Sequence, residues 1–197
     1  RTGYASYRKI KQISMIKFIK YAILPLWFTY MVIFMFENIV YYNPSVSEPL
    51  GYYLALPGLK YQKGDVVLIC IPDDKYKLIF NQLGLIDDGS CDNGLPHILK
   101  TIVASIGDVI RVAESGIFIN NKYQRNSAQF QEGNGVNLYP LPVGWSHKLK
   151  ADEFFLLGNS LHSVDSRYFG IVTRKNVYRR AIFIFSNNKN LSVREAL

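Results

Sequence analysis

The sequence predicts a mainly β domain that follows an N-terminal transmembrane helix. Residues 21–36 are apolar or aromatic except for Pro25 and Thr29, whereas beyond Val40 the chain changes to short β-branched runs separated by turn signals. A chain of 197 residues with 49% hydrophobic content is long and apolar enough for one anchor and one domain with a buried core.

The net charge of +8 is concentrated at the N-terminus. Residues 1–36 hold six basic and no acidic residues, which leaves 17 basic against 15 acidic residues in the remainder. A remainder so balanced has no basic patch of the kind that binds DNA or RNA, so we expect no nucleic-acid partner. By the positive-inside rule, the basic flank at 1–17 favours a cytoplasmic N-terminus and an extracytoplasmic or periplasmic position for the rest of the chain.

Residues 18–40 are expected to form a single-pass anchor in the inner membrane. Phe18 and Ile19 extend the apolar run to 19 positions if Lys20 reaches the headgroups, and about 20 residues span the hydrocarbon core as a helix. A cleaved signal peptide needs small residues after its apolar core, but Glu37 and its neighbours offer none. A buried helix of a soluble domain is the remaining alternative.

Residues 41–185 are expected to form one extracytoplasmic domain, rich in strands. The strands follow or precede turn signals such as Gly64-Asp65, Gly107-Asp108 and Asn120-Asn121. The expected strands are 66–71, 98–106, 109–112, 117–119, 153–157 and 180–185.

One helix is expected in this domain, over residues 75–83. Its apolar residues share one helical face: Tyr76, Ile79, Phe80 and Leu83. The glycine- and proline-rich stretch at 126–150 is expected to be irregular, and residues 186–197 to form a polar tail.

Three segments of the domain carry candidate chemistry: residues 43–53, 99–108 and 158–170. None is a metal motif, since the histidines are scattered and no histidine–cysteine cluster has ligand spacing. There is also no glycine-rich phosphate loop. We expect neither a metal nor an organic cofactor.

These segments resemble those of the S26 signal-peptidase family, in particular its conjugative-transfer branch (the TraF type). The nucleophile motif N-x-[ST]-x-S-x-P-x-G-x-Y is matched by Asn43, Ser45, Ser47, Pro49, Gly51 and Tyr53. Lys100 stands seven residues before Gly107-Asp108, where the family has its general base. The third motif, S-x-D-S-R-Y-[FW]-G, is matched by residues 163–170.

The resemblance implies a signal-peptidase-like antiparallel β-sheet domain and a catalytic pair of Ser47 as nucleophile with Lys100 as general base. It further implies that the Ser45 hydroxyl pairs with the backbone N–H of Ser47 and supports the oxyanion, and that Ser163 orients Lys100. Asp165 and Arg167 are expected to form a structural ion pair near the site.

The chemistry places a demand on Lys100. A serine hydroxyl needs a base to take its proton during attack, and a lysine is a base only when neutral. Its pKa must therefore fall about two to three units from about 10.4, which burial achieves by disfavouring the charged form. On a strand, Lys100 shares a face with Ile102 and Ala104, which is consistent with an inward-pointing lysine.

Cys70 and Cys91 are the two cysteines of the chain. An even number outside the cytoplasm is compatible with a disulfide, with two free thiols as the alternative. The resemblance also favours the bond, because the conjugative branch tends to have cysteines at similar places.

We therefore expect a membrane-anchored serine endopeptidase that cleaves a membrane-borne precursor. The resemblance implies a propilin of a conjugative type IV secretion system. The first alternative is a general type I signal peptidase for secretory precursors. Two features disfavour it: Pro49 lies two positions after Ser47, and Glu48 stands where such peptidases have methionine. The second alternative is a catalytically inactive anchored β domain of a secretion complex. The anchor argues against a third, a self-cleaving repressor-type protease.

Overall fold

The computed structural model describes residues 17–84 and 89–186, and the chain divides into two units after Val40. The polar tail expected at 186–197 lies, except for its first residue, outside the described residues. The basic flank at 1–17 lies outside them except for Lys17.

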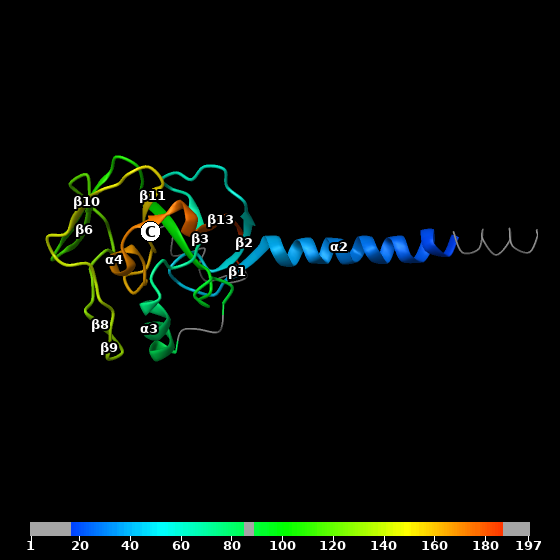
Figure 1. Cartoon of the computed structure of the whole chain (residues 1–197), viewed down its shortest axis with the longest axis horizontal. Helices are drawn as coiled ribbons and strands as arrows, with labels where there is room; N and C mark the ends of the chain where they lie inside the picture. The colour runs from blue at the N-terminus through cyan, green and yellow to red at the C-terminus, as the bar shows by residue number, and fades with distance from the viewer. Residues whose placement is uncertain (1–16, 85–88, 187–197) are drawn as a thin grey trace, which may run out of the picture. The chain divides into compact units, whose positions relative to one another are not determined.

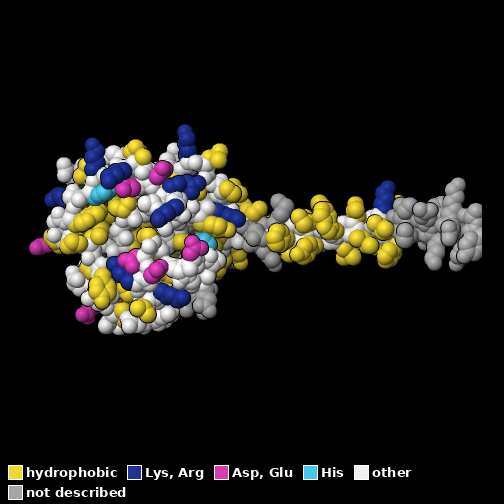
Figure 2. Space-filling view, viewed as in Figure 1, with side chains coloured by type: hydrophobic (Ala, Val, Ile, Leu, Met, Phe, Trp, Pro, Cys, Tyr) yellow, Lys and Arg dark blue, Asp and Glu magenta, His cyan; other side chains and the backbone are white. Residues whose placement is uncertain are grey.

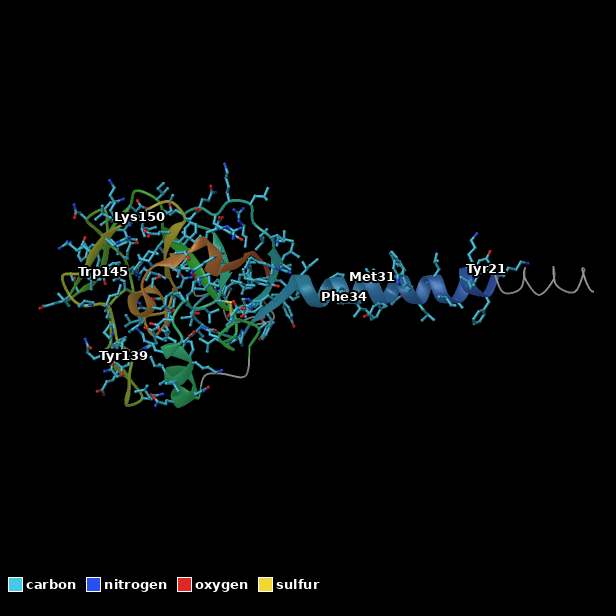
Figure 3. All side chains as sticks on the ribbon, viewed as in Figure 1. Tyr21, Met31, Phe34, Tyr139, Trp145 and Lys150 are labelled. Atoms are coloured by element: carbon cyan, nitrogen blue, oxygen red, sulfur yellow. A yellow bond between two sulfur atoms is a disulfide. The ribbon has the colours of Figure 1, made fainter. Side chains whose placement is uncertain are left out.

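The N-terminal unit is helical. A π-helical turn, η1 (Ile19–Ile23), is followed by α2 (Leu24–Ile39), with Pro25 in the first turn, where a missing N–H costs little. Apolar side chains such as Tyr21 and Phe34 point outward and are exposed (Figures 2 and 3). Over residues 17–84 and 89–186, no single helix has both the length and the apolar composition that crossing a membrane requires. The anchor expected at 18–40 is not confirmed.

The second unit is built on a seven-stranded sheet in the order β1-β2-β13-β3-β4-β11-β12 (Figure 1). Pairing is antiparallel between β2 and β13 and between each later pair of neighbours, so the expected mainly β class is confirmed. The strands are β1 (Val40–Asn43), β2 (Gly51–Leu56), β3 (Val66–Ile69), β4 (Ile98–Ala104), β11 (Glu153–Leu157), β12 (Val172–Thr173) and β13 (Val177–Phe185).

Two smaller sheets complete the described strands. The order β10-β5-β6-β7 joins β5 (Val109–Ala113), β6 (Gly116–Ile119), β7 (Lys122–Tyr123) and β10 (Ser146–Lys148). Asn120 and Asn121 connect β6 to β7 with φ of 50° and 65°, the conformation that a two-residue hairpin requires. β8 (Glu132–Gly133) pairs with β9 (Val136–Asn137) next to α3 (Figure 1).

The helix expected at 75–83 is confirmed as α3 (Lys75–Leu83), which ends on Gly84 in the left-handed conformation. The expected strands are confirmed with small shifts of their ends. The sequence did not predict β1, β2, β7, β12, the short helix α4 (Ser166–Phe169) or the 3-10 turn η2 (Arg174–Asn176). It was also wrong to leave 126–150 without strands, since β8, β9 and β10 lie there.

The core explains how β4 can carry a lysine. Ile102 packs in the main cluster with residues of α3 and β11, and Ile98 packs against that cluster. Leu99 packs with Tyr53 on the opposite face. Because side chains alternate along a strand, Lys100 shares the face of Ile98 and Ile102 and lies between them at the sheet surface.

The disulfide is confirmed, because Cys70 and Cys91 are bonded. It closes a segment with a sequence separation of 21 that contains α3. The bond therefore links the residue after β3 to the segment that follows α3.

Candidate active site

Two segments far apart in sequence bring Ser47 and Lys100 together. Ser47 lies in the loop between β1 and β2, and Lys100 lies in β4. The Lys100 Nζ donates a hydrogen bond of 3.0 Å to the Ser47 Oγ, and each residue is 5% exposed. The separation lies within the range that proton transfer requires.

Asn43 shapes the loop that carries the serine. Its side-chain amide donates to the carbonyl oxygens of Ser45, Glu48 and Pro49, at 2.9, 3.1 and 3.1 Å. The loop is also held at Ser47, whose carbonyl accepts the backbone N–H of Asn159 at 2.6 Å. These bonds satisfy backbone groups that a buried loop would otherwise leave unpaired.

Burial lowers the pKa of Lys100 to about 8, because the charged ammonium has lost its water. Asp165 and Glu48 oppose this shift by attracting the ammonium, and Arg167 adds to it by repulsion. The direction is the one that a lysine acting as a general base needs.

Ser45 lies beside Ser47. Its Oγ accepts the backbone N–H of Ser47 at 3.3 Å and lies 2.9 Å from the Ser47 Oγ. The pairing of hydroxyl and N–H expected from the motif is therefore present.

Ser163 does not make the contact expected of it. Its Oγ is buried and has no hydrogen-bond partner within the described part of the chain, so it does not hold Lys100 in this structure. The hydroxyl faces Gly158 instead. A Cβ at position 158 would collide with the Ser163 Oγ and lie 3.1 Å from the Ser47 Cβ, so this position requires glycine.

Asp165 and Arg167 form the expected ion pair, with both side chains fully buried. The guanidinium donates to both carboxylate oxygens, through Nε at 2.8 Å and Nη2 at 2.9 Å. The carboxylate also accepts the backbone N–H groups of Gly158 and Arg167, the latter capping α4. The pair fixes the segment that forms one wall of the site.

A cavity of about 290 Å³ opens beside Ser47 and Lys100. Its lining combines serines and His162 with apolar side chains from four segments: Ser45, Val46, Phe80, Pro96, Ile98, Ser160, His162, Ser163 and Val164. An acyl group could therefore sit against apolar atoms next to the serine hydroxyl.

The family model described as signal peptidase, peptidase S26, matches residues 12–186. This protein belongs to the S26 signal-peptidase family. The S26 chain is 28% identical over 145 residues to a plasmid transfer protein TraF of Escherichia coli, covering 68% of this chain and 76% of that protein. It is 26% identical over 148 residues to a conjugal transfer protein TraF of Agrobacterium tumefaciens, covering 73% and 81%. Within the family it therefore belongs to the TraF-type branch.

A crystal structure of a signal peptidase I from Enterococcus faecalis matches 64% of this S26 chain and 97% of its own length, at 17% identity. The TM-score of this match is 0.34.

Sequence reasoning missed one residue of the S26 site, Glu48. Its side chain is 3% exposed and accepts hydrogen bonds from the Thr101 hydroxyl at 2.8 Å and the Asn159 amide at 3.0 Å. Burial raises the pKa of Glu48 to about 7, against the opposing effects of the Thr101 bond and the Lys100 charge. The only signal in the sequence was its departure from methionine.

The S26 chain also brings His97 close to Cys70 and Cys91, with possible ligand atoms within 4.8 Å of one another. Sequence spacing did not indicate this cluster. Because the two sulfur atoms are bonded to each other, they are not available as thiolate ligands.

Proposed function

We propose that this chain is a serine endopeptidase in which Ser47 is the nucleophile and Lys100 the general base. The observation that carries the proposal is the buried 3.0 Å contact between the Lys100 Nζ and the Ser47 Oγ. The lowered pKa of Lys100, to about 8, supports it because a useful fraction of the amine is neutral near that pH.

The geometry suggests the order of bond changes. Neutral Lys100 takes the proton of Ser47 as its Oγ forms a bond to the scissile carbonyl carbon. The oxyanion then accepts hydrogen bonds from the Ser47 N–H and the Ser45 hydroxyl. The C–N bond breaks, and the Lys100 ammonium returns the proton to the leaving amine. Water attacks the acyl-enzyme with Lys100 again as base, which releases the carboxylate product and restores Ser47.

The proposed substrate is a precursor protein with a signal peptide, specifically a propilin of a conjugative type IV secretion system. Support comes from family membership and from relatives that are named for plasmid or conjugal transfer. The apolar wall of the cavity, which includes Phe80 and Val164, suits a small apolar side chain next to the scissile bond.

We further propose that residues 18–40 anchor the chain in the inner membrane, with the catalytic domain in the periplasm. The apolar run at 21–36 and its exposed side chains support this, and a disulfide fits an oxidising compartment. Carbonate extraction and protease protection in spheroplasts test it. Release of the full chain into the soluble fraction would contradict the anchor.

The function is tested by co-expressing the propilin of the same genetic element with wild type, Ser47→Ala or Lys100→Met and measuring the propilin mass. Each site variant should slow processing by at least about 10³-fold. Ser146→Ala and Lys122→Ala, which replace the same residue types outside the site, should process normally. Processing by Ser47→Ala would refute the proposal, and equal processing of unrelated secretory precursors would indicate a general signal peptidase.

A further inference from the structure

Glu48 directly follows the nucleophile, yet its side chain points into the protein. The two carboxylate oxygens have different partners. Oε1 accepts from the hydroxyl of Thr101 at 2.8 Å, and Oε2 accepts from the side-chain amide of Asn159 at 3.0 Å. One carboxyl thus contacts two segments that lie 53 and 111 residues away in the chain.

These two partners are the neighbours of the catalytic groups. Thr101 follows Lys100 in β4, and Asn159 donates its own backbone N–H to the carbonyl of Ser47. The carboxyl of Glu48 therefore ties the loop of the nucleophile to the strand of the base and to the segment after β11. An apolar side chain at this position would leave the Thr101 hydroxyl and the Asn159 amide without these bonds.

The charge of Glu48 also acts on the site. Within the described residues, the charged groups that influence it are Lys100, which attracts the carboxylate, and Asp165, which repels it. Glu48 in turn raises the pKa of Lys100 and so opposes the effect of burial, together with Asp165 and against Arg167. Ionised Glu48 therefore keeps Lys100 protonated to a higher pH than a neutral residue would.

We propose that Glu48 is a positioning residue, whose carboxyl fastens the Ser47 loop to the Lys100 strand and sets the pH at which the pair becomes active. This role rests on the proposed function of Ser47 and Lys100.

The test compares Glu48→Gln with Glu48→Met, because glutamine removes the charge but keeps polar atoms for Thr101 and Asn159, whereas methionine removes both. The pH profile of kcat/KM is measured for each with the purified full chain and a peptide spanning the propilin cleavage site. In Glu48→Gln, the acidic limb of the kcat/KM profile should lie about one pH unit lower than in wild type. The plateau of Glu48→Met should fall about tenfold below that of Glu48→Gln, because the loop is no longer held. Glu132→Gln removes a carboxylate exposed on β8 and should leave the limb unchanged.

A second readout needs no substrate. Because burial raises the pKa of Glu48 in the folded state, its ionisation destabilises the fold as pH rises from about 5 to about 8. The melting temperature of Glu48→Gln should therefore rise relative to wild type over this interval. A constant difference in melting temperature, coincident pH profiles of wild type and Glu48→Gln, or equal plateaus of the two Glu48 variants would each overturn the role of Glu48. Cleavage by Ser47→Ala would overturn the proposed function itself, so the two failures are distinguishable.

Discussion

Replacing Asp165 with asparagine should lower the melting temperature of the catalytic domain strongly, although the two side chains have nearly the same shape. Arg167 is 0% exposed, and Asp165 is the carboxylate that forms an ion pair with it. The variant keeps one oxygen acceptor but leaves the buried guanidinium without its counter-charge.

The magnitude follows from the contacts of Arg167. Removing one partner of a buried ion pair costs about 3–5 kcal/mol. The guanidinium keeps hydrogen bonds to the carbonyl oxygens of Asn126, Ala128, Ser160, Leu161 and Ser163. These acceptors favour the lower end, about 3 kcal/mol. Since 1 kcal/mol shifts the melting temperature of a domain of about 150 residues by about 2–4 °C, we expect a decrease of about 6–12 °C.

The assay is thermal unfolding of the purified chain followed by circular dichroism at pH 7. The control is Lys75→Gln, which removes the half-exposed ion pair between Lys75 and Asp73 and should cost less than about 1 kcal/mol. A decrease for Asp165→Asn no larger than that of the control would refute the argument that a buried, unpaired guanidinium dominates.

Three further predictions follow from other contacts. The wild-type kcat/KM should rise with pH through an apparent pKa near 8, because burial lowers the pKa of Lys100 and only the neutral amine accepts the Ser47 proton; a limb near pH 10 in a peptide assay would contradict this. Replacing both Cys70 and Cys91 with serine should cost about 3 kcal/mol in urea unfolding, because the bond closes a loop between cysteines with a sequence separation of 21; a reductant should destabilise wild type but not the variant. Tyr76→Phe should be neutral or stabilising by up to about 1 kcal/mol, because the buried Tyr76 hydroxyl has no hydrogen-bond partner among the residues that the structure describes. Tyr53→Phe should cost about 1 kcal/mol by losing the 2.7 Å bond to the Pro49 carbonyl, and equal costs of the two variants in urea unfolding would argue against this reasoning.

The periodic spacing of apolar residues was enough to predict those helices and strands that are long enough to show it. Tyr76, Ile79 and Phe80 are buried on one face of α3, as their spacing indicated. The four-residue helix α4 is too short to show a helical period. Its N-cap Asp165 is local in sequence and accepts the backbone N–H of Arg167. The acceptors that surround the buried guanidinium are not local, since they include the carbonyl groups of Asn126 and Ala128, 41 and 39 residues away.

Some residues of the candidate site could be predicted from the sequence, and others could not. The motif resemblance selected Ser47, Lys100 and Asp165, and the structure brings their segments together. It could not select Glu48, because the motif leaves that position unspecified and the partners of the carboxylate, Thr101 and Asn159, lie 53 and 111 residues away in the chain. Nor could it foresee that the Ser163 hydroxyl faces Gly158 rather than Lys100.

The sequence alone determined the residue types of the site, the mainly β class and the cysteines available for a disulfide, because these depend on local patterns and on residue identity. Tertiary structure decided the protonation chemistry. The pKa values of Lys100 and Glu48 shift because atoms from the β1–β2 loop, β4 and residues 158–165 exclude water from both groups at once. Desolvation is a property of that assembled surrounding, so no single segment of the chain carries it.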